Sequence, residues 1–109
     1  MEVEKMGSVT IVHTDERLDS AVSPKLKNLI KKIAQEDGVK VVVNMEKTRL
    51  IDSSGCGELV AALKTVAKNN GEMKLANPSS QVYSLLQLTR LHRILDIHES
   101  LESAVKSFH

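Results

Sequence analysis

Residues 50–57 read Leu-Ile-Asp-Ser-Ser-Gly-Cys-Gly, and they stand between an apolar run typical of a strand and an amphipathic pattern typical of a helix. The stretch therefore predicts a tight turn from strand to helix. Ser53 and Ser54 would lie at the helix N-terminus, where backbone N–H groups lack partners within the helix. Such a turn can hold a phosphate, because the free N–H groups and the positive end of the helix dipole meet there.

Strand patterns precede and follow this turn. The run Val39-Lys40-Val41-Val42-Val43-Asn44 is almost continuously β-branched and apolar, as expected of a central strand that is covered on both faces. A hairpin joined at Gly7 is expected at the start of the chain, with Asp15–Asp19 as a charged loop after it. The segments with strand patterns are residues 2–6, 8–14, 39–44, 73–76 and 94–97.

Helical periodicity marks four segments. Ser23 and Pro24 predict the start of the first helix, as an N-cap hydroxyl followed by proline, and Gly38 is expected to end it. The third helix is expected to open at Asn77-Pro78-Ser79. Two apolar stripes are predicted, one on the helix after the key turn (Cys56, Leu59, Val60, Leu63, Ala67) and one on a C-terminal helix (Leu101, Ala104, Val105, Phe108).

Alternation of strands and helices favours right-handed crossovers and a parallel sheet. We therefore predict an α/β fold with a mixed, largely parallel sheet of four to five strands and about four flanking helices. Residues 1–109 are expected to form one domain, because the length suits one core and no linker or repeat interrupts the pattern.

Composition excludes several classes of partner. Lys and Arg number 15 against 14 Asp and Glu, and aromatic residues make up 2% of the chain, so neither nucleic acid nor a membrane surface is an expected partner. The start Met1-Glu2-Val3-Glu4 lacks the pattern of a signal peptide, and no stretch approaches the roughly 20 apolar residues of a membrane span. A single cysteine suits a reducing compartment. These features predict a cytoplasmic protein.

Catalytic and cofactor motifs are incomplete. Ser53 and Ser54 could act as nucleophiles only with a histidine base, which neither His92 nor His98 is placed to supply, and the first glycine of the hydrolase elbow is missing. Val60 replaces the third glycine of a dinucleotide fingerprint, and a Walker-type lysine is absent. We expect no catalytic residue and no cofactor. We also expect no metal site, since the remaining candidate ligands, His13, His92, His98, His109 and Cys56, lack zinc-type spacing.

Local physics alone leaves two interpretations of the turn open. Asp52, Ser53 and Ser54 can serve only as turn and capping residues, or they can form a recognition or modification site. Cys56 presents the same choice. Its position near a helix N-terminus could lower the pKa of its thiol, whereas its place on the apolar stripe favours a small core residue.

The run Asp52-Ser53-Ser54-Gly55, followed by Cys56-Gly57 and an amphipathic helix, resembles the signature of the STAS domain, as in bacterial anti-sigma-factor antagonists. The likeness extends over nearly the whole chain. It includes Leu18-Asp19 before the first helix, the 41–44 strand, Gly71-Glu72-Met73, and Pro78 with Val82 and Leu86 ahead of Ile94.

The resemblance implies a binding module and not an enzyme. In the family, the unmodified antagonist binds an anti-sigma factor that is also a GHKL-type serine kinase, and so frees the sigma factor. The kinase phosphorylates the serine after the aspartate, here Ser53, with Ser54 as the second candidate. A metal-dependent serine phosphatase reverses the modification. The residues implied in partner binding are Asp19, Asp52, Ser53, Ser54, Gly55, Cys56 and Gly57.

The sequence departs from the family pattern at two places, and the second bears on the choice of partner. Cys56 stands where the family often has leucine, which conserves an apolar contact. Glu16-Arg17 replaces the usual Gly-Glu before Leu-Asp, in a loop that the family fold brings near the phosphorylation turn. The alternative function is that of a STAS subunit in another assembly, such as a stressosome or a lipid-transport complex.

Overall fold

A computed structural model of the chain describes residues 1–108; His109, one of the histidines considered above, lies outside the described residues. The main sheet has five strands in the order β1-β2-β4-β6-β7. Strands β1 and β2 are antiparallel and meet at Gly7, whose φ of +63° suits glycine, whereas all other neighbours are parallel. The strands are β1 Glu2–Met6, β2 Val9–His13, β4 Lys40–Asn44, β6 Glu72–Ala76 and β7 Asp96–His98.

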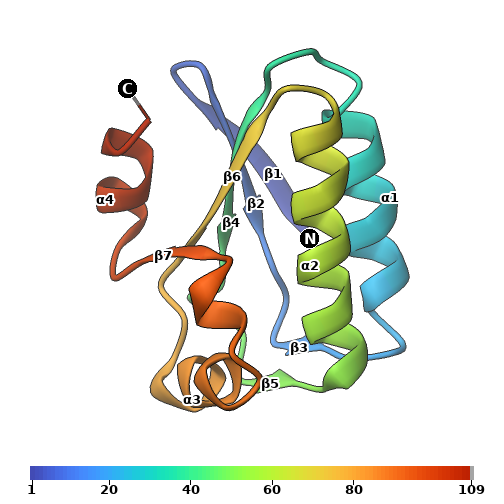
Figure 1. Cartoon of the computed structure of the whole chain (residues 1–109), viewed down its shortest axis with the longest axis vertical. Helices are drawn as coiled ribbons and strands as arrows, with labels where there is room; N and C mark the ends of the chain where they lie inside the picture. Colours follow the sequence, from blue (N-terminus) through green and yellow to red (C-terminus); the bar gives the residue numbers. More distant parts are fainter. Residues whose placement is uncertain (109) are drawn as a thin grey trace.

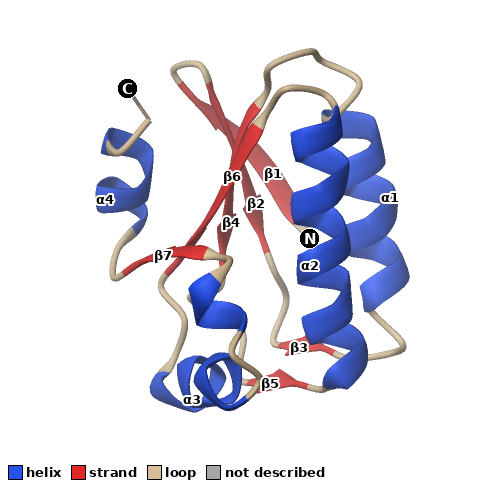
Figure 2. Ribbon diagram, in the orientation of Figure 1, coloured by secondary structure: helices blue, strands red, loops and turns tan. Residues whose placement is uncertain are grey.

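Helices cover both faces of this sheet. The long helices α1 (Ser23–Ile33) and α2 (Ser53–Lys68) lie side by side on one face, and the short α4 (Leu101–Lys106) lies on the other (Figure 2). Helix α3 (Ser80–Leu88) and the 3-10 turn η1 (Leu91–Arg93) lie at the end where the parallel strands finish (Figure 1). The predicted α/β fold, with its mixed sheet and four helices, is confirmed.

Two apolar clusters hold the layers together. The larger one fills the space between the sheet and the helices α1 and α2, and the smaller one lies under α4. The β4 run Val41-Val42-Val43 contributes to both, because successive side chains of a strand point to opposite faces. This explains its uninterrupted apolar sequence. Within residues 1–108, no helix combines the length and the apolar character needed to cross a membrane.

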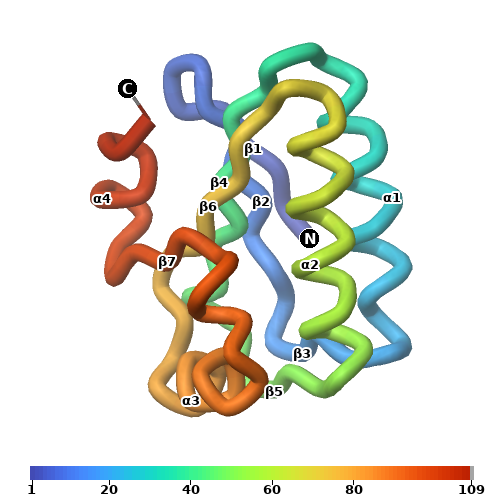
Figure 3. Tube along the Cα trace, in the orientation of Figure 1, coloured from blue at the N-terminus to red at the C-terminus, as the bar shows by residue number. Residues whose placement is uncertain are grey.

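Two short strands were not predicted. β3 (Arg17–Leu18) lies in the segment that we expected to be a charged loop, and β5 (Leu50–Ile51) lies inside the predicted turn. They pair with each other in parallel and lie side by side near the start of α2 (Figure 3). Two residues are too few for an alternating pattern, so the sequence carries no strand signal there.

The last strand is displaced from its prediction. It comprises Asp96–His98 instead of residues 94–97, because Ile94 still belongs to the turn that follows η1 and donates its N–H to the Leu91 carbonyl. Asp96 is polar because it pairs across the strands with Lys74 of β6. Because this strand begins with a charged residue, its start has no apolar pattern by which the sequence could predict it.

The first helix begins at Ser23 as predicted, but its capping differs. The Ser23 hydroxyl donates to the Asp19 carbonyl oxygen at 2.7 Å, and Val22 occupies the N-cap without a side-chain hydrogen bond. The helix also ends at Ile33, well before Gly38. Gly38 instead has a φ of +71° in the following turn and donates its N–H to the Asn69 carbonyl.

The buried stripe of α2 is rotated from the predicted one. Cys56 and Leu59 are buried as expected, but Ala67 is exposed, and Ala62 and Val66 complete the buried face. Residues 59, 62 and 66 satisfy helical spacing as well as the predicted set does. The choice between the two stripes is made by packing against the sheet and α1, which the helix sequence alone does not encode.

Lys74 is buried on the face of the sheet beneath the C-terminal segment. Its Nζ lies 2.7 Å from Asp96 Oδ2 and 4.8 Å from the centre of the Phe108 ring. The hydrogen bond from Lys74 outweighs the opposing effect of burial and holds the pKa of the Asp96 carboxyl below its ordinary value, with a smaller contribution in the same direction from His98. The pair therefore stabilises the fold wherever Asp96 is ionised.

We expect Asp96→Asn to destabilise the protein by about 1–2 kcal/mol at pH 7, because the buried Lys74 ammonium loses its counter-ion. The loss is smaller than for a fully buried pair, since Asp96 is half exposed and water screens its charge. The folded-state pKa is lowered, so this stabilisation is present above the unfolded pKa of about 4 and is lost as the pH falls through the folded value. Urea denaturation of wild type and variant at pH 7 and pH 3 measures the difference in the free energy of unfolding.

The matched control is Glu102→Gln, which breaks the exposed Lys106 pair on α4. Exposed pairs contribute little, so this variant should differ from wild type by less than about 0.5 kcal/mol at pH 7. An Asp96→Asn loss of equal size at both pH values would contradict the ionic origin of the effect.

Candidate functional site

Asp52 fixes the start of α2. It is the N-cap residue in an extended conformation, and its Oδ1 accepts the Gly55 N–H at 2.9 Å. Its Oδ2 accepts the backbone N–H of Ser20 at 3.3 Å. Both carboxylate oxygens are thus used within the protein, one on the helix and one on the loop before α1. Asp52 therefore connects the two segments that surround the helix start.

Ser53 and Ser54 are the first two residues of α2, and both are exposed. Their location matches the expectation from the sequence. The first backbone N–H groups of a helix have no carbonyl partner within it, and the helix dipole adds positive potential there. The fixed Asp52 cap and the exposed hydroxyls together present a defined polar surface to solvent.

Gly55 and Gly57 differ in what surrounds them. A Cβ on Gly55 would lie 2.1 Å from the Leu18 carbonyl oxygen and 2.8 Å from Cγ1 of Ile51, so only glycine fits between α2 and the β3–β5 pair. A Cβ on Gly57 would meet nothing within 4 Å, and the residue is exposed. The fold requires the first glycine, whereas the second leaves the surface beside Ser53 bare.

Cys56 is 6% exposed and belongs to the larger apolar cluster. Burial, and secondarily the charge of Asp52, raises the pKa of its thiol above the ordinary value. Both effects favour the neutral thiol over the reactive thiolate. The core interpretation of Cys56 therefore fits the structure better than the reactive one.

Asp19 shapes the loop beside the turn. Its Oδ1 accepts the backbone N–H groups of Ala21 and Val22 at 3.1 and 3.2 Å, and its Oδ2 lies 2.8 Å from the Arg17 guanidinium. The next residue, Ser20, donates to Asp52. The structure thus brings the Asp19 loop and the Asp52 turn together, with the Asp19 carboxylate turned toward its own backbone.

The histidines belong to other clusters. His13 contacts Glu4 at 2.6 Å and Asn44 at 3.1 Å, and His98 contacts Asp96 at 3.1 Å and Ser103 at 3.2 Å. His92 lies in η1. Across residues 1–108, no group of three or more His, Cys, Asp or Glu side chains is arranged to hold a metal ion.

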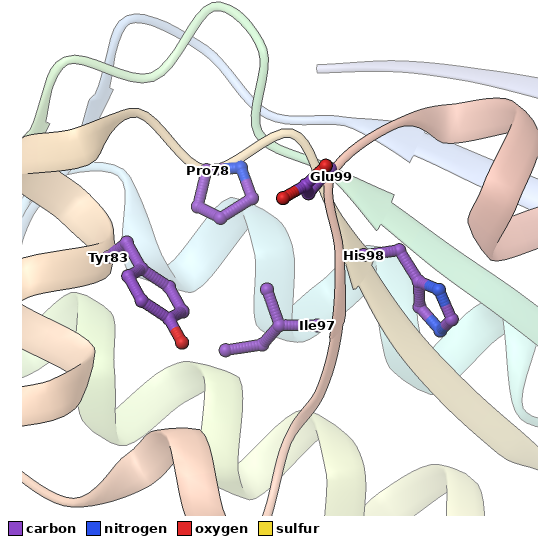
Figure 4. A pocket seen from close by; sticks show the side chains of 5 residues that line it. All are labelled: Pro78, Tyr83, Ile97, His98 and Glu99. Carbon is purple, nitrogen blue, oxygen red and sulfur yellow. The ribbon is translucent and has the colours of Figure 1, made fainter.

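The surface also has hollows that the sequence did not predict, and two of them adjoin α3. One, of about 360 Å³, lies between α3 and β7 (Figure 4). Tyr83, Pro78, Ile97 and Glu99 surround it, and the His98 ring points away from it, so Glu99 is the one acidic group among its lining residues. The other, of about 330 Å³, lies between β5 and α3, directly before Asp52, and is lined by Arg49, Leu50, Ile51, Gln81, Val82 and Leu85.

Known proteins resemble this chain in sequence and in fold. An anti-sigma-B factor antagonist from Staphylococcus aureus is 27% identical over 85 residues, which cover 78% of this chain and 79% of that protein. An anti-sigma factor antagonist from Mycobacterium paratuberculosis has the same fold, with a TM-score of 0.87 at 19% identity over 97% of this chain and 90% of that one.

The phosphorylated form of the Bacillus cell fate determinant SpoIIAA is a further structural neighbour. Its TM-score is 0.74 at 19% identity, with 99% of this chain and 98% of that chain covered. The family model described as the STAS domain matches residues 1–104. Because this match spans nearly the whole sequence, the chain belongs to the STAS domain family.

Proposed function

We propose that the protein is an anti-sigma factor antagonist whose binding is switched by phosphorylation of Ser53. The observation that carries the proposal is the exposed Ser53 at the first position of α2, directly after the fixed Asp52 cap. In its unmodified form the protein binds an anti-sigma factor of the GHKL serine kinase type and frees the sigma factor. It acts as a substrate and binding module in the cytoplasm, and a metal-dependent serine phosphatase restores it.

The shape of the helix start supports access by a kinase. Ser53 and Gly57 are four residues apart and therefore share one face of α2. Since Gly57 has no side chain and open space around it, a partner can approach the Ser53 hydroxyl closely. The two hydrogen bonds of Asp52 hold the backbone of the turn in place, so the hydroxyl is offered without reordering of the loop.

Ser53 is expected to receive one phosphate when the protein is incubated with its anti-sigma factor, ATP and Mg²⁺. Peptide mass spectrometry after the reaction identifies the modified residue. The Ser53→Ala variant should not be phosphorylated, whereas the matched variant Ser54→Ala should still receive one phosphate. Phosphate found only on Ser54 would assign the regulatory site to Ser54, and phosphate on any other residue would contradict the proposal.

The identity of the co-purifying protein separates this function from its alternative. A GHKL-type kinase bound to the unphosphorylated protein supports the antagonist function. Stable recovery instead within a stressosome or a lipid-transport complex would favour a role as a STAS subunit of that assembly.

A further inference from the structure

The groove between β5 and α3 adjoins the phosphorylation turn. Its lining includes Leu50 and Ile51, and Ile51 directly precedes Asp52 in the chain. The start of α2, β5 and α3 all lie at the same end of the molecule (Figure 1). A partner that covers Ser53 is therefore within reach of the groove.

Large apolar side chains are exposed in and beside this groove. Leu50 is 58% exposed, and Leu88, one turn beyond the groove residue Leu85 on α3, is 81% exposed. Gln81, Leu85 and Leu88 share one face of α3, because they stand at i, i+4 and i+7. Leu50 and Leu85 line the same groove, and exposed apolar surface that is gathered in one place is typical of protein interaction sites.

Among the residues that line the groove, Arg49 alone is charged. The nearest acidic groups are Asp52, whose two carboxylate oxygens already accept hydrogen bonds, and the Asp15, Glu16 and Glu46 side chains of a neighbouring hollow that Arg49 also lines. Residues 77–95 contain no Asp or Glu, although acidic and basic residues are nearly balanced in the whole chain. Arg90 and Arg93 are exposed in this segment, and Arg49 lines the groove itself. These three arginines form no ion pair with residues 1–108. The groove and the segment beside it are therefore apolar and basic, which complements an apolar and acidic partner.

We propose that the groove receives an amphipathic helix of the anti-sigma factor, in which leucine-like side chains are flanked by Asp and Glu. The naming of the partner rests on the proposed function, but the chemistry of the surface does not. A helix suits the site because the face of α3 offers apolar positions at helical spacing. Strand addition is a poor fit, since β5 offers only two residues.

This assignment also bears on the switch. Phosphorylation of Ser53 adds about −1.5 to −2 charge next to the Asp52 carboxylate. An acidic helix seated beside that turn would be repelled by the new charge. The groove would thus make the complex more sensitive to the modification than contact at the Ser53 hydroxyl alone.

The first test uses the anti-sigma factor that phosphorylates Ser53. Arg49→Glu is expected to weaken its binding by about tenfold or more, since like charge then faces the acidic helix. Lys5→Glu, an equal charge change at an exposed position of the edge strand β1, should leave the affinity within about twofold because it lies outside the contact. Hydrogen exchange of the complex should show protection over residues 81–88.

Unchanged affinity of Arg49→Glu, or no protection over residues 81–88, overturns the groove proposal while phosphorylation of Ser53 still stands. Should no kinase partner be found, two synthetic helical peptides probe the groove directly. One carries leucines at i, i+3 and i+7 among glutamates, and the other has lysines in place of the glutamates. Shifts of the NMR amide signals of residues 49–51 and 81–88 with the acidic peptide alone support the groove proposal. Their absence overturns it.

Discussion

Gly55→Ala is expected to destabilise the protein by about 2–3 kcal/mol, the upper part of the usual range for overpacking. The new Cβ would lie 2.1 Å from the Leu18 carbonyl oxygen, which is backbone and cannot move aside as a side-chain tip would. The β3–β5 pair or the first turn of α2 has to shift. Urea denaturation followed by circular dichroism measures the change in the free energy of unfolding.

Gly57→Ala is the matched control, two residues further along the same helix. No atom lies within 4 Å of the added Cβ, so the higher helix propensity of alanine should stabilise the fold. The expected gain is about 0.5–1 kcal/mol. A loss of stability for Gly55→Ala together with a gain for Gly57→Ala would support the close contact between Gly55 and Leu18. A loss of stability in both would point to a general intolerance of α2 and contradict it.

Gly55 illustrates what the sequence could not reveal about the site. The pattern of residues 50–57 predicts a strand-to-helix turn, because Asp52 is a strong cap and an amphipathic helix follows. The contact that makes glycine necessary comes from Leu18, far away in the chain, through the pairing of β3 and β5. Long-range pairing of two-residue strands has no local signature.

The sheet was predictable for the opposite reason. The three central strands, β2, β4 and β6, contain β-branched or apolar runs that are long enough to predict a strand from the local sequence. The right-handedness of crossovers between parallel strands then predicts how they connect. The groove beside Asp52, by contrast, exists only because residues 49–51 and 81–85 meet in the fold. The acid-free run from 77 to 95 is visible in the sequence, but its relation to a groove appears only when α3 is placed beside β5.

Ser53→Asp should abolish binding to the anti-sigma factor while leaving the fold intact. A negative charge at the first position of α2 gains about 0.3–1 kcal/mol from the helix dipole and free N–H groups. Repulsion from the Asp52 carboxylate opposes this gain, and that carboxylate already has two hydrogen-bond donors. The opposing effects predict a melting temperature near that of wild type.

The loss of binding must then arise at the interface. Like charges placed together across an interface cost several kcal/mol, whereas a micromolar complex is held by about 8 kcal/mol. A loss of about 3 kcal/mol would weaken such a complex more than 100-fold. Aspartate carries less charge than phosphate, so the modified protein should bind even more weakly. Ser53→Ala should bind persistently, because it presents no charge and accepts no phosphate.

Calorimetric titration and thermal melts of the two variants measure binding and folding separately. Ser54→Asp adds the same charge one residue later, where the side chain points about 100° away around the helix, and should weaken binding less. This control separates the position of the charge from its mere presence. If Ser53→Asp binds as tightly as wild type, or fails only because it is unfolded, the interface explanation is wrong. If Ser54→Asp is the more damaging variant, the partner faces Ser54, and the bare surface beside Gly57 is not the side from which the kinase approaches.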